Sequence, residues 1–295
     1  MMDFLTFFVN VFIFIFGLCI GSFLNCVIYR LEQKKTLKGR SICPVCKSKL
    51  LWRDLIPVFS FLFLGRKCRY CRKSISWQYP IVELTTGILF LIIFNLSTQP
   101  FIVELSLNNY LQTSISVINF LNLAFLFYIT AALVAIFFYD LNYYIIPDKI
   151  LFPAIIIAFL YRLFENLIIE NWILNSNFKF QISNFSAVSD YLFAAVIASG
   201  FFLAIFFVSR GRWMGFGDVK LAVLMGLLLG FPNILAALFL AFLFGAVTGT
   251  ALMIFKGKNL RSEVPFAPFL IAGTFIALFW GSEVINWYLS ATFFI

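Results

Sequence analysis

The sequence predicts an all-α protein that crosses a membrane about eight times. Apolar residues make up 62% of the chain, and its mean hydropathy is +0.99. Runs of about twenty apolar residues recur along it, the length that a helix needs to span the hydrocarbon core of a bilayer. The third observation is the placement of the +9 net charge, because basic residues gather in connections on one side of the expected spans.

The first apolar run, about residues 5–29, is expected to be a retained helix. It is too long for a cleavable signal peptide, and no small-residue cleavage site follows it. From residue 30 to 73 there are thirteen Lys or Arg against two acids, which predicts a cytoplasmic segment and an outside N-terminus. A basic block is also compatible with a nucleic-acid surface. Beside a membrane span, contact with anionic lipid is the favoured explanation, and we expect no nucleic-acid partner.

Seven further spans follow from the alternation of apolar runs with polar connections. The loops 97–116 and 170–189 are poor in Lys and Arg and are expected outside, whereas each predicted inner connection carries basic residues. The expected spans are residues 81–96, 117–139, 150–169, 191–208, 218–231, 234–255 and 265–288. The span at 218–231 is the shortest, and both termini are expected outside. The predicted organisation is a first helix (1–30), a cytoplasmic insert (31–79) and a membrane domain (80–295).

The insert carries two Cys-x-x-Cys pairs. The pairs are Cys43 with Cys46 and Cys68 with Cys71, a pattern typical of a structural zinc site with four thiolate ligands. Because an insert of about fifty residues has little core of its own, metal would supply its folding energy. A dithiol redox pair and two disulfides are the alternatives, although a reducing cytoplasm disfavours stable disulfides. Cys19 and Cys26 lie in an apolar run, where we expect buried, inert thiols.

Two acids lie at predicted membrane boundaries. The chain has no histidine, which excludes Ser-His and Cys-His catalysis and the HExxH metalloproteases. Asp218 follows Gly215 and Gly217, which are expected to let another backbone approach closely; an N-cap role explains this acid equally well. Asp140 ends an apolar run, where the helix dipole disfavours negative charge. A carboxylate at such depth is costly unless it is paired, hydrated or functional, so we predict that both acids form one catalytic site on the cytoplasmic side.

Two aspartates in one site predict aspartyl-protease chemistry. One ionised carboxylate takes a proton from water, and the other, protonated, donates to the scissile carbonyl. The helix ends suggest that Asp218 is the base and that Asp140 holds the proton. Asp148 is expected to be an N-cap, with a substrate or water contact as the alternative, and Lys220, Gly215 and Gly217 are expected to support the site.

Two other functions are compatible with these residues. A membrane thiol oxidoreductase would use the Cys-x-x-Cys pairs, and its aspartates would be dispensable. A proton-coupled transporter would use Asp140 and Asp218 as a proton relay, and it would cleave no peptide.

Several motifs together resemble one known family. They are Gly21-Ser22-Phe23-Leu24-Asn25, both Cys-x-x-Cys pairs, Tyr79-Pro80-Ile81-Val82-Glu83-Leu84, Asp140 with Ile146-Pro147-Asp148, Gly215-Phe216-Gly217-Asp218-Val219-Lys220 and Pro265-Phe266-Ala267-Pro268. In this order, over nearly the whole chain, they resemble the prepilin peptidases, which are membrane aspartyl proteases of the GxGD type.

The resemblance implies an activity and a location. Such enzymes reside in the bacterial inner membrane and remove a short basic leader from prepilin and pseudopilin precursors at the cytoplasmic face. Many also methylate the new N-terminus with S-adenosylmethionine. The family's catalytic aspartates match Asp140 and Asp218, and its zinc ligands match the four insert cysteines. Ala267 replaces a usual glycine, and no Gly-rich nucleotide-binding loop is apparent, so the methyltransferase activity is implied by resemblance alone.

Overall fold

The computed structural model describes residues 2–98, 109–175, 188–256 and 264–293. In these residues the regular secondary structure is helical, and the only β-type pairing is two isolated bridges, Ile42 with Lys49 and Lys67 with Ser74. The all-α prediction is therefore confirmed. The chain falls into two compact units, residues 1–138 and 139–295.

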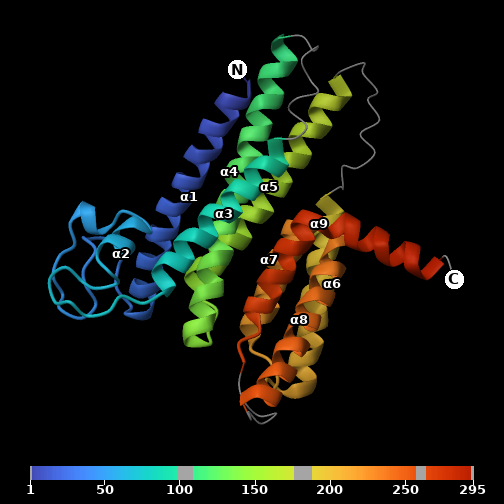
Figure 1. Cartoon of the computed structure of the whole chain (residues 1–295). Coiled ribbons are helices and arrows are strands. Elements are labelled where there is room, and N and C mark those ends of the chain that lie inside the picture. The colour runs from blue at the N-terminus through green and yellow to red at the C-terminus, as the bar shows by residue number, and fades with distance from the viewer. Residues whose placement is uncertain (1, 99–108, 176–187, 257–263, 294–295) are drawn as a thin grey trace. The chain divides into compact units, whose positions relative to one another are not determined.

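The first unit is built on two long helices, α1 (Met2–Glu32) and α3 (Gln78–Thr98), which pack side by side (Figure 1). The first part of α4 (Asn109–Tyr143) belongs to this unit, and the Phe127 ring stacks on Phe90 of α3 with centroids 4.2 Å apart. The insert contains only η1 (Trp52–Asp54) and α2 (Phe59–Phe63) as helical segments. It lies at one end of α1 and α3 (Figure 1), where the chain leaves one helix and enters the other.

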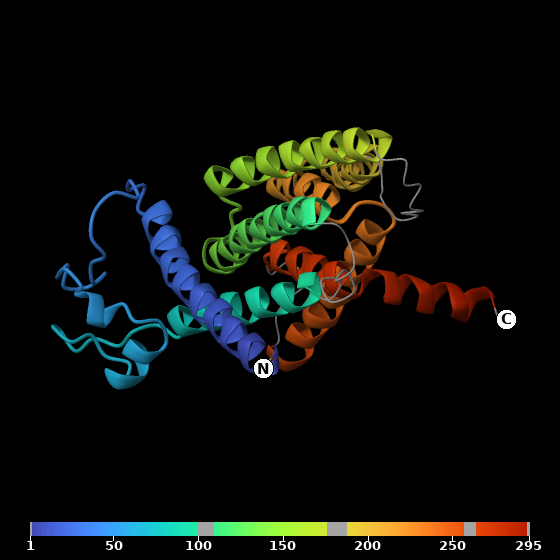
Figure 2. The ribbon, with the colours of Figure 1, turned by 90° about the horizontal axis from the view of Figure 1, so that it is seen from above.

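The second unit is organised around the short helix α7 (Phe216–Leu229). The Leu, Val, Ala and Met side chains of α7 itself point to every side of the helix and are buried along most of its length. This is expected for a helix without a solvent-facing side. Its neighbours are α5 (Asp148–Asn175), α6 (Val188–Ser209), α8 (Asn233–Lys256) and α9 (Ala267–Phe293). α9 changes direction at Trp280, whose backbone is not helical (Figures 1 and 2).

Six described helices are long and apolar enough to cross a membrane, namely α1, α3, α4, α6, α8 and α9. The other two predicted spans correspond to α5 and α7. With 14 residues, α7 is about 21 Å long, shorter than a hydrocarbon core of about 30 Å.

Some predicted loop boundaries are wrong. α4 already begins at Asn109, and α5 continues to Asn175, so parts of the predicted loops 97–116 and 170–189 are helical. Polar residues continue a helix readily beyond an apolar run, because the backbone hydrogen bonds do not depend on the side chains. Residues 99–108 and 176–187 of these loops lie outside the described part of the chain.

Close packing between α6 and α7 depends on Gly226. A Cβ atom at this position would lie 2.3 Å from the Cα of Ala195, which is backbone and cannot rotate away. We expect Gly226→Ala to destabilise the protein by about 1–3 kcal/mol through overpacking, measured as a lower thermal unfolding midpoint in detergent. Gly200→Ala on α6 is the matched control, because no atom lies within 4 Å of its added methyl group. Equal midpoints for the two variants would contradict the close α6–α7 contact.

Candidate active site and metal centre

Asp140 and Asp218 line the same pocket in the second unit. The pocket has a volume of about 470 Å³, and both aspartates are largely buried, with 5% and 8% of their surfaces exposed. The two carboxyl groups are close enough for their charges to interact. The structure thus brings together two acids that are 78 residues apart in the sequence.

Each aspartate accepts a backbone hydrogen bond at the start of a helix. Asp140 lies in the last turn of α4 and accepts from the N–H of Ala267, the first residue of α9. Asp218 accepts from the N–H of Gly215, which is the N-cap of α7. Asp218 itself is the third residue of α7, so the alternative that it caps the helix is wrong.

These positions do not support the expected roles, in which Asp218 is the base and Asp140 holds the proton. The prediction placed Asp140 at a negative helix end and Asp218 at a positive one. In the structure, α4 continues to Tyr143, and Asp140 faces the N-terminus of α9 as well. Because both carboxyl groups lie at the positive end of a helix, helix dipoles alone do not determine which one is ionised.

Gly215 and Gly217, which precede Asp218, do not have another backbone segment as their nearest neighbour, although this was expected. A Cβ atom on Gly217 would lie 3.1 Å from Cβ of Ile146, so a side chain, and not another backbone, approaches this residue. Around Gly215 the nearest atom to an added Cβ is the nitrogen of Gly217 at 3.9 Å. The prediction of close backbone approach is therefore wrong, although both glycines line the pocket and leave it room.

A charged pair lies at the rim of the same pocket. Lys220 Nζ donates to both carboxylate oxygens of Asp148, at 2.7 and 2.9 Å, and both residues line the pocket. The ammonium group also lies 5.0 Å from the Phe152 ring and 5.4 Å from the Phe216 ring. Asp148 is the first residue of α5, and its carboxylate is bound by Lys220 instead of capping the helix as expected. The pair joins α5 to α7 beside the two aspartates.

The four insert cysteines form one cluster. The Sγ atoms of Cys43, Cys46, Cys68 and Cys71 all lie within 4.8 Å of one another. In a tetrahedral site with Zn–S distances near 2.3 Å, sulfur atoms are about 3.8 Å apart, and those of Cys43 and Cys71 are 4.0 Å apart. All four cysteines are free thiols in the structure. The donor set therefore fits a tetrahedral, thiolate-preferring metal such as zinc.

The two Cys-x-x-Cys segments fold in the same way. In the first, the N–H of Cys43 donates to Ser48 and that of Lys47 to Cys43; in the second, Cys68 donates to Lys73 and Arg72 to Cys68. Lys47 and Arg72 have positive φ angles of 57° and 55°. Two such turns of matching geometry aim both cysteines of each pair at one point, as a metal site requires.

The carboxylate of Asp54 connects two segments of the insert by hydrogen bonds beside the cysteine cluster. Its carboxylate accepts 2.7 Å from Nε of Arg69 and 3.1 Å from the N–H of Leu51, and it also accepts from Tyr70. Burial opposes ionisation of this carboxylate, but these hydrogen bonds outweigh it and hold the pKa of Asp54 below its usual value. The ionised carboxylate therefore stabilises the fold above its unfolded pKa, and this contribution disappears as the pH falls through the lowered one.

The remaining cysteines are not buried as expected. Cys19 is exposed on α1, and Cys26 is partly buried. The prediction failed because an apolar helix in a membrane protein has apolar residues on every face, so the sequence does not show which face packs inward.

Comparison with known proteins assigns the chain to a family. Residues 15–96 match the family described as bacterial peptidase A24 N-terminal domain, and residues 125–250 match the type IV leader peptidase family. A prepilin leader peptidase/N-methyltransferase of Bacillus subtilis is 30% identical over 281 residues, covering 94% of this chain and 96% of the relative. The chain belongs to this family.

Other prepilin leader peptidase/N-methyltransferases are similar over the same extent. That of Aeromonas salmonicida (strain A449) is 28% identical, covering 94% of this chain and 93% of its own. That of Legionella pneumophila is 26% identical, covering 93% of this chain and 92% of its own. No solved structure matches the chain. The family assignment confirms the resemblance that the motifs indicated.

In this member of the prepilin leader peptidase family, one buried residue near α7 was missed in the sequence. Arg162 of α5 donates from Nε to the carbonyl of Leu227 at 3.1 Å and from a terminal nitrogen to that of Leu228 at 2.9 Å. These carbonyls belong to the last turn of α7, where the helix itself supplies no donors. The guanidinium group also pairs with Glu165 at 2.7 Å and lies 3.8 Å from the ring centroid of Tyr191. A lone arginine inside a predicted span was the available signal.

We expect Arg162→Met to destabilise the second unit strongly. It would leave two buried carbonyls without their donors and Glu165 without its counter-charge, and breaking such a buried pair costs about 3–5 kcal/mol. The measurement is the thermal unfolding midpoint of the purified protein in detergent. Arg162→Met combined with Glu165→Gln removes the unpaired charge and should recover part of the loss. A single variant as stable as wild type would show that Arg162 does not hold the end of α7.

Proposed function

We propose that this chain is a membrane aspartyl endopeptidase that removes the leader from prepilin-like precursors, with Asp140 and Asp218 as its catalytic pair. The observation that carries the proposal is one pocket in which two buried carboxyl groups, from segments far apart in the sequence, have interacting charges. The substrate class comes from the names of the relatives.

The chemistry follows from the presence of both carboxyl groups in one pocket. In the proposed mechanism one carboxyl group is ionised while the other holds a proton. The ionised carboxylate takes a proton from a water molecule, whose oxygen attacks the scissile carbonyl carbon. The protonated carboxyl group donates its proton to the carbonyl oxygen. When the tetrahedral intermediate breaks the C–N bond, the leaving nitrogen takes a proton and the products are a carboxylate and a new amine.

The rim pair is proposed to position the substrate. Lys220 and Asp148 line the pocket and are bound to each other, and the proton transfers proposed above involve neither of them. Gly215 and Gly217 are proposed to leave space for the extended backbone of the precursor. Orientation follows from the positive-inside rule, which puts the active site at the cytoplasmic face of the bacterial inner membrane.

The insert is proposed to be a zinc-dependent module, residues 31–79, between the first helix (1–30) and the peptidase domain (80–295). The four thiolates close the coordination shell, so the metal would have a structural role. Such a metal would stabilise the insert and take no part in peptide cleavage.

The insert is also proposed to rest on anionic lipid. Trp52, Leu62 and Phe63 are 69%, 63% and 86% exposed, and the guanidinium of Arg53 lies 5.3 Å from the Trp52 ring. Exposed aromatic side chains beside basic residues suit the interface of an anionic membrane. In nanodiscs, brominated phosphatidylglycerol should quench tryptophan fluorescence less in Trp52→Phe than in wild type; equal quenching would argue against this contact.

The second proposed activity is methylation of the new N-terminal amine, as the names of the relatives indicate. Both activities are tested by co-expressing the chain with a prepilin whose mature N-terminus is analysed by mass spectrometry. We expect loss of the leader and a gain of one methyl group. Ion-coupled flux without cleavage would favour a transporter, and redox activity that needs the cysteines but not the aspartates would favour a thiol oxidoreductase.

A further inference from the structure

The last part of α9 leaves the helices of the second unit. The backbone of Trp280 is not helical, with φ −135° and ψ 22°, and beyond it the helix turns away from α6, α7 and α8 (Figures 1 and 2). Residues 286–291 are all exposed, and the side chains of Trp287 and Tyr288 are 71% and 61% exposed. We call residues 281–291 the α9 arm. Its large apolar side chains are not covered by the described part of the chain.

The bend that starts the α9 arm lies level with the beginning of α8. A Cβ atom on Gly273 would lie 2.4 Å from the carbonyl oxygen of Ala237, and one on Gly281 would lie 2.8 Å from Oδ1 of Asn233, the first residue of α8. α9 therefore runs antiparallel to α8 and reaches its first residue at Gly281. With 24 residues, α8 is about 36 Å long, enough to cross a hydrocarbon core of about 30 Å. An α8 that crosses the membrane puts Asn233, and with it the start of the arm, at a membrane boundary.

The α9 arm has one polar and one apolar face. Ser282, Asn286 and Ser290 are four residues apart, so they share one side of the helix, and Glu283 borders this row. The apolar side chains occupy the rest of the helix surface, and they are Val284, Ile285, Trp287, Tyr288, Leu289 and Ala291. In water this arm would expose a large apolar face, and in hydrocarbon it would bury a carboxylate at high cost. The lipid–water interface accommodates both faces, and it is where Trp and Tyr gather in membrane proteins.

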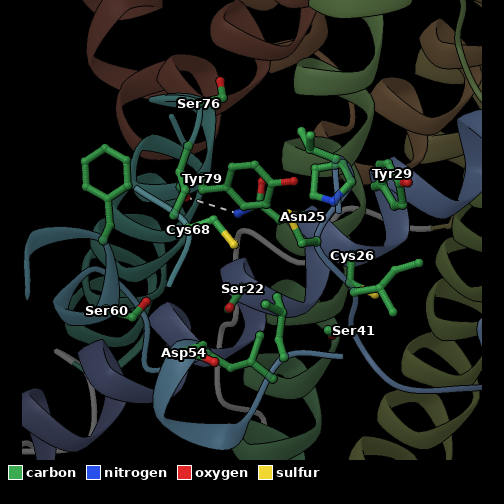
Figure 3. Close-up of a pocket in the computed structure, with 18 of the residues that line it drawn as sticks. Ser22, Asn25, Cys26, Tyr29, Ser41, Asp54, Ser60, Cys68, Ser76 and Tyr79 are labelled. Carbon is green, nitrogen blue, oxygen red and sulfur yellow. Dashed lines mark hydrogen bonds between the residues drawn. The ribbon is translucent and has the colours of Figure 1, made fainter. Parts of the chain in front are cut away.

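Charge distinguishes the α9 arm from the insert end of the first unit. Figure 3 shows the cavity of about 680 Å³ between the insert and the ends of α1 and α3. The acids of its lining are Asp54 and Glu83, whereas its basic residues are Arg30, Lys35, Lys38, Arg40, Arg69 and Lys73. Such an excess of basic residues is typical of the inner membrane face. The arm has no Lys or Arg, and α8 carries Lys256 at its other end, so the positive-inside rule puts the arm at the outer face.

We propose that the α9 arm lies flat in the lipid–water interface at the outer face of the membrane, with its apolar face among the acyl chains and its polar face toward water. Amphipathic helices of this kind bury their apolar face about 5–10 Å below the headgroup boundary. The membrane crossing of α9 then ends at the bend near Trp280. Because the arm has no basic residues, burial of its apolar face holds it there, and anionic headgroups are not required.

Spin-label accessibility tests this position on the full-length protein in phosphatidylcholine nanodiscs. A genetically encoded spin-labelled amino acid replaces either Ala291 on the apolar face or Asn286 on the polar face, both of which are exposed. Collisions with oxygen report lipid, and collisions with a water-soluble nickel complex report water. We expect the oxygen-to-nickel collision ratio to be at least about threefold higher at position 291 than at position 286. The label at position 286 is the matched control, because it lies on the same helix but faces the other way.

Three results would overturn the proposed position of the arm. Frequent nickel collisions at both positions would show an arm that extends into water. Oxygen collisions without nickel at both positions would show an arm that continues through hydrocarbon. A label at position 291 that neither reagent reaches would show that protein covers the apolar face. Nanodiscs with one third phosphatidylglycerol should give the same ratio, and a difference between the two faces that depends on this anionic lipid would contradict the proposed apolar attachment.

Discussion

Replacing either Asp140 or Asp218 with Asn is expected to lower prepilin cleavage by at least about a thousandfold. Positioned acid–base groups contribute about 10²–10⁴ in rate, and two groups that share one proton act as a unit. The double variant should therefore be little worse than either single one, because removing one member already disables the pair. The measurement is the rate of leader removal from a purified prepilin in detergent micelles.

Two acids of the second unit serve as controls for this result. Asp190→Asn changes an acid in the first turn of α6, away from the pocket, and should leave the rate unchanged. Asp148→Asn breaks a partly exposed ion pair at the rim, so we expect at most about a tenfold change, mainly in KM. Cleavage by Asp140→Asn or Asp218→Asn at the wild-type rate would show that the catalytic pair was assigned to the wrong residues.

Removing the metal from the insert is expected to have the second large effect. We expect one zinc per chain in the purified protein, and its loss on Cys43→Ser or Cys71→Ser. Binding of structural zinc is worth about 10–16 kcal/mol in small zinc modules, far more than the few apolar contacts of α2 and η1 supply. The insert should unfold and become sensitive to trypsin, because its many Lys and Arg residues are then accessible.

Cys19 and the reactivity of the insert thiols provide the control for zinc binding. Cys19→Ser changes an exposed thiol on α1 and should retain the zinc. In wild type, the four insert thiols should react with a thiol reagent only after a chelator is added. Four thiols that react freely in a metal-free and folded insert would favour the redox alternative.

Much of the site could be predicted because its chemistry is unusual in this composition. Asp140 and Asp218 were recognisable as acids at the ends of apolar runs, where a carboxylate is costly without a function. The cysteine pairs were recognisable because their spacing alone places two sulfur atoms on one turn. Arg162 carried the same signal as the aspartates, and its partners are backbone carbonyls of a helix that begins 54 residues later, so its role was not visible in the sequence.

The sequence by itself determined the helical class, the membrane location and the four-cysteine cluster, because apolar length and local spacing are properties of neighbouring residues. Only the tertiary structure decided that Asp148 binds Lys220, that Glu83 lines a cavity, and that Asp140 faces the first N–H of α9. Each of these depends on which face of an apolar helix packs inward. When every face of a helix is apolar, the sequence pattern does not show which face packs inward. Close packing between the helices determines that face.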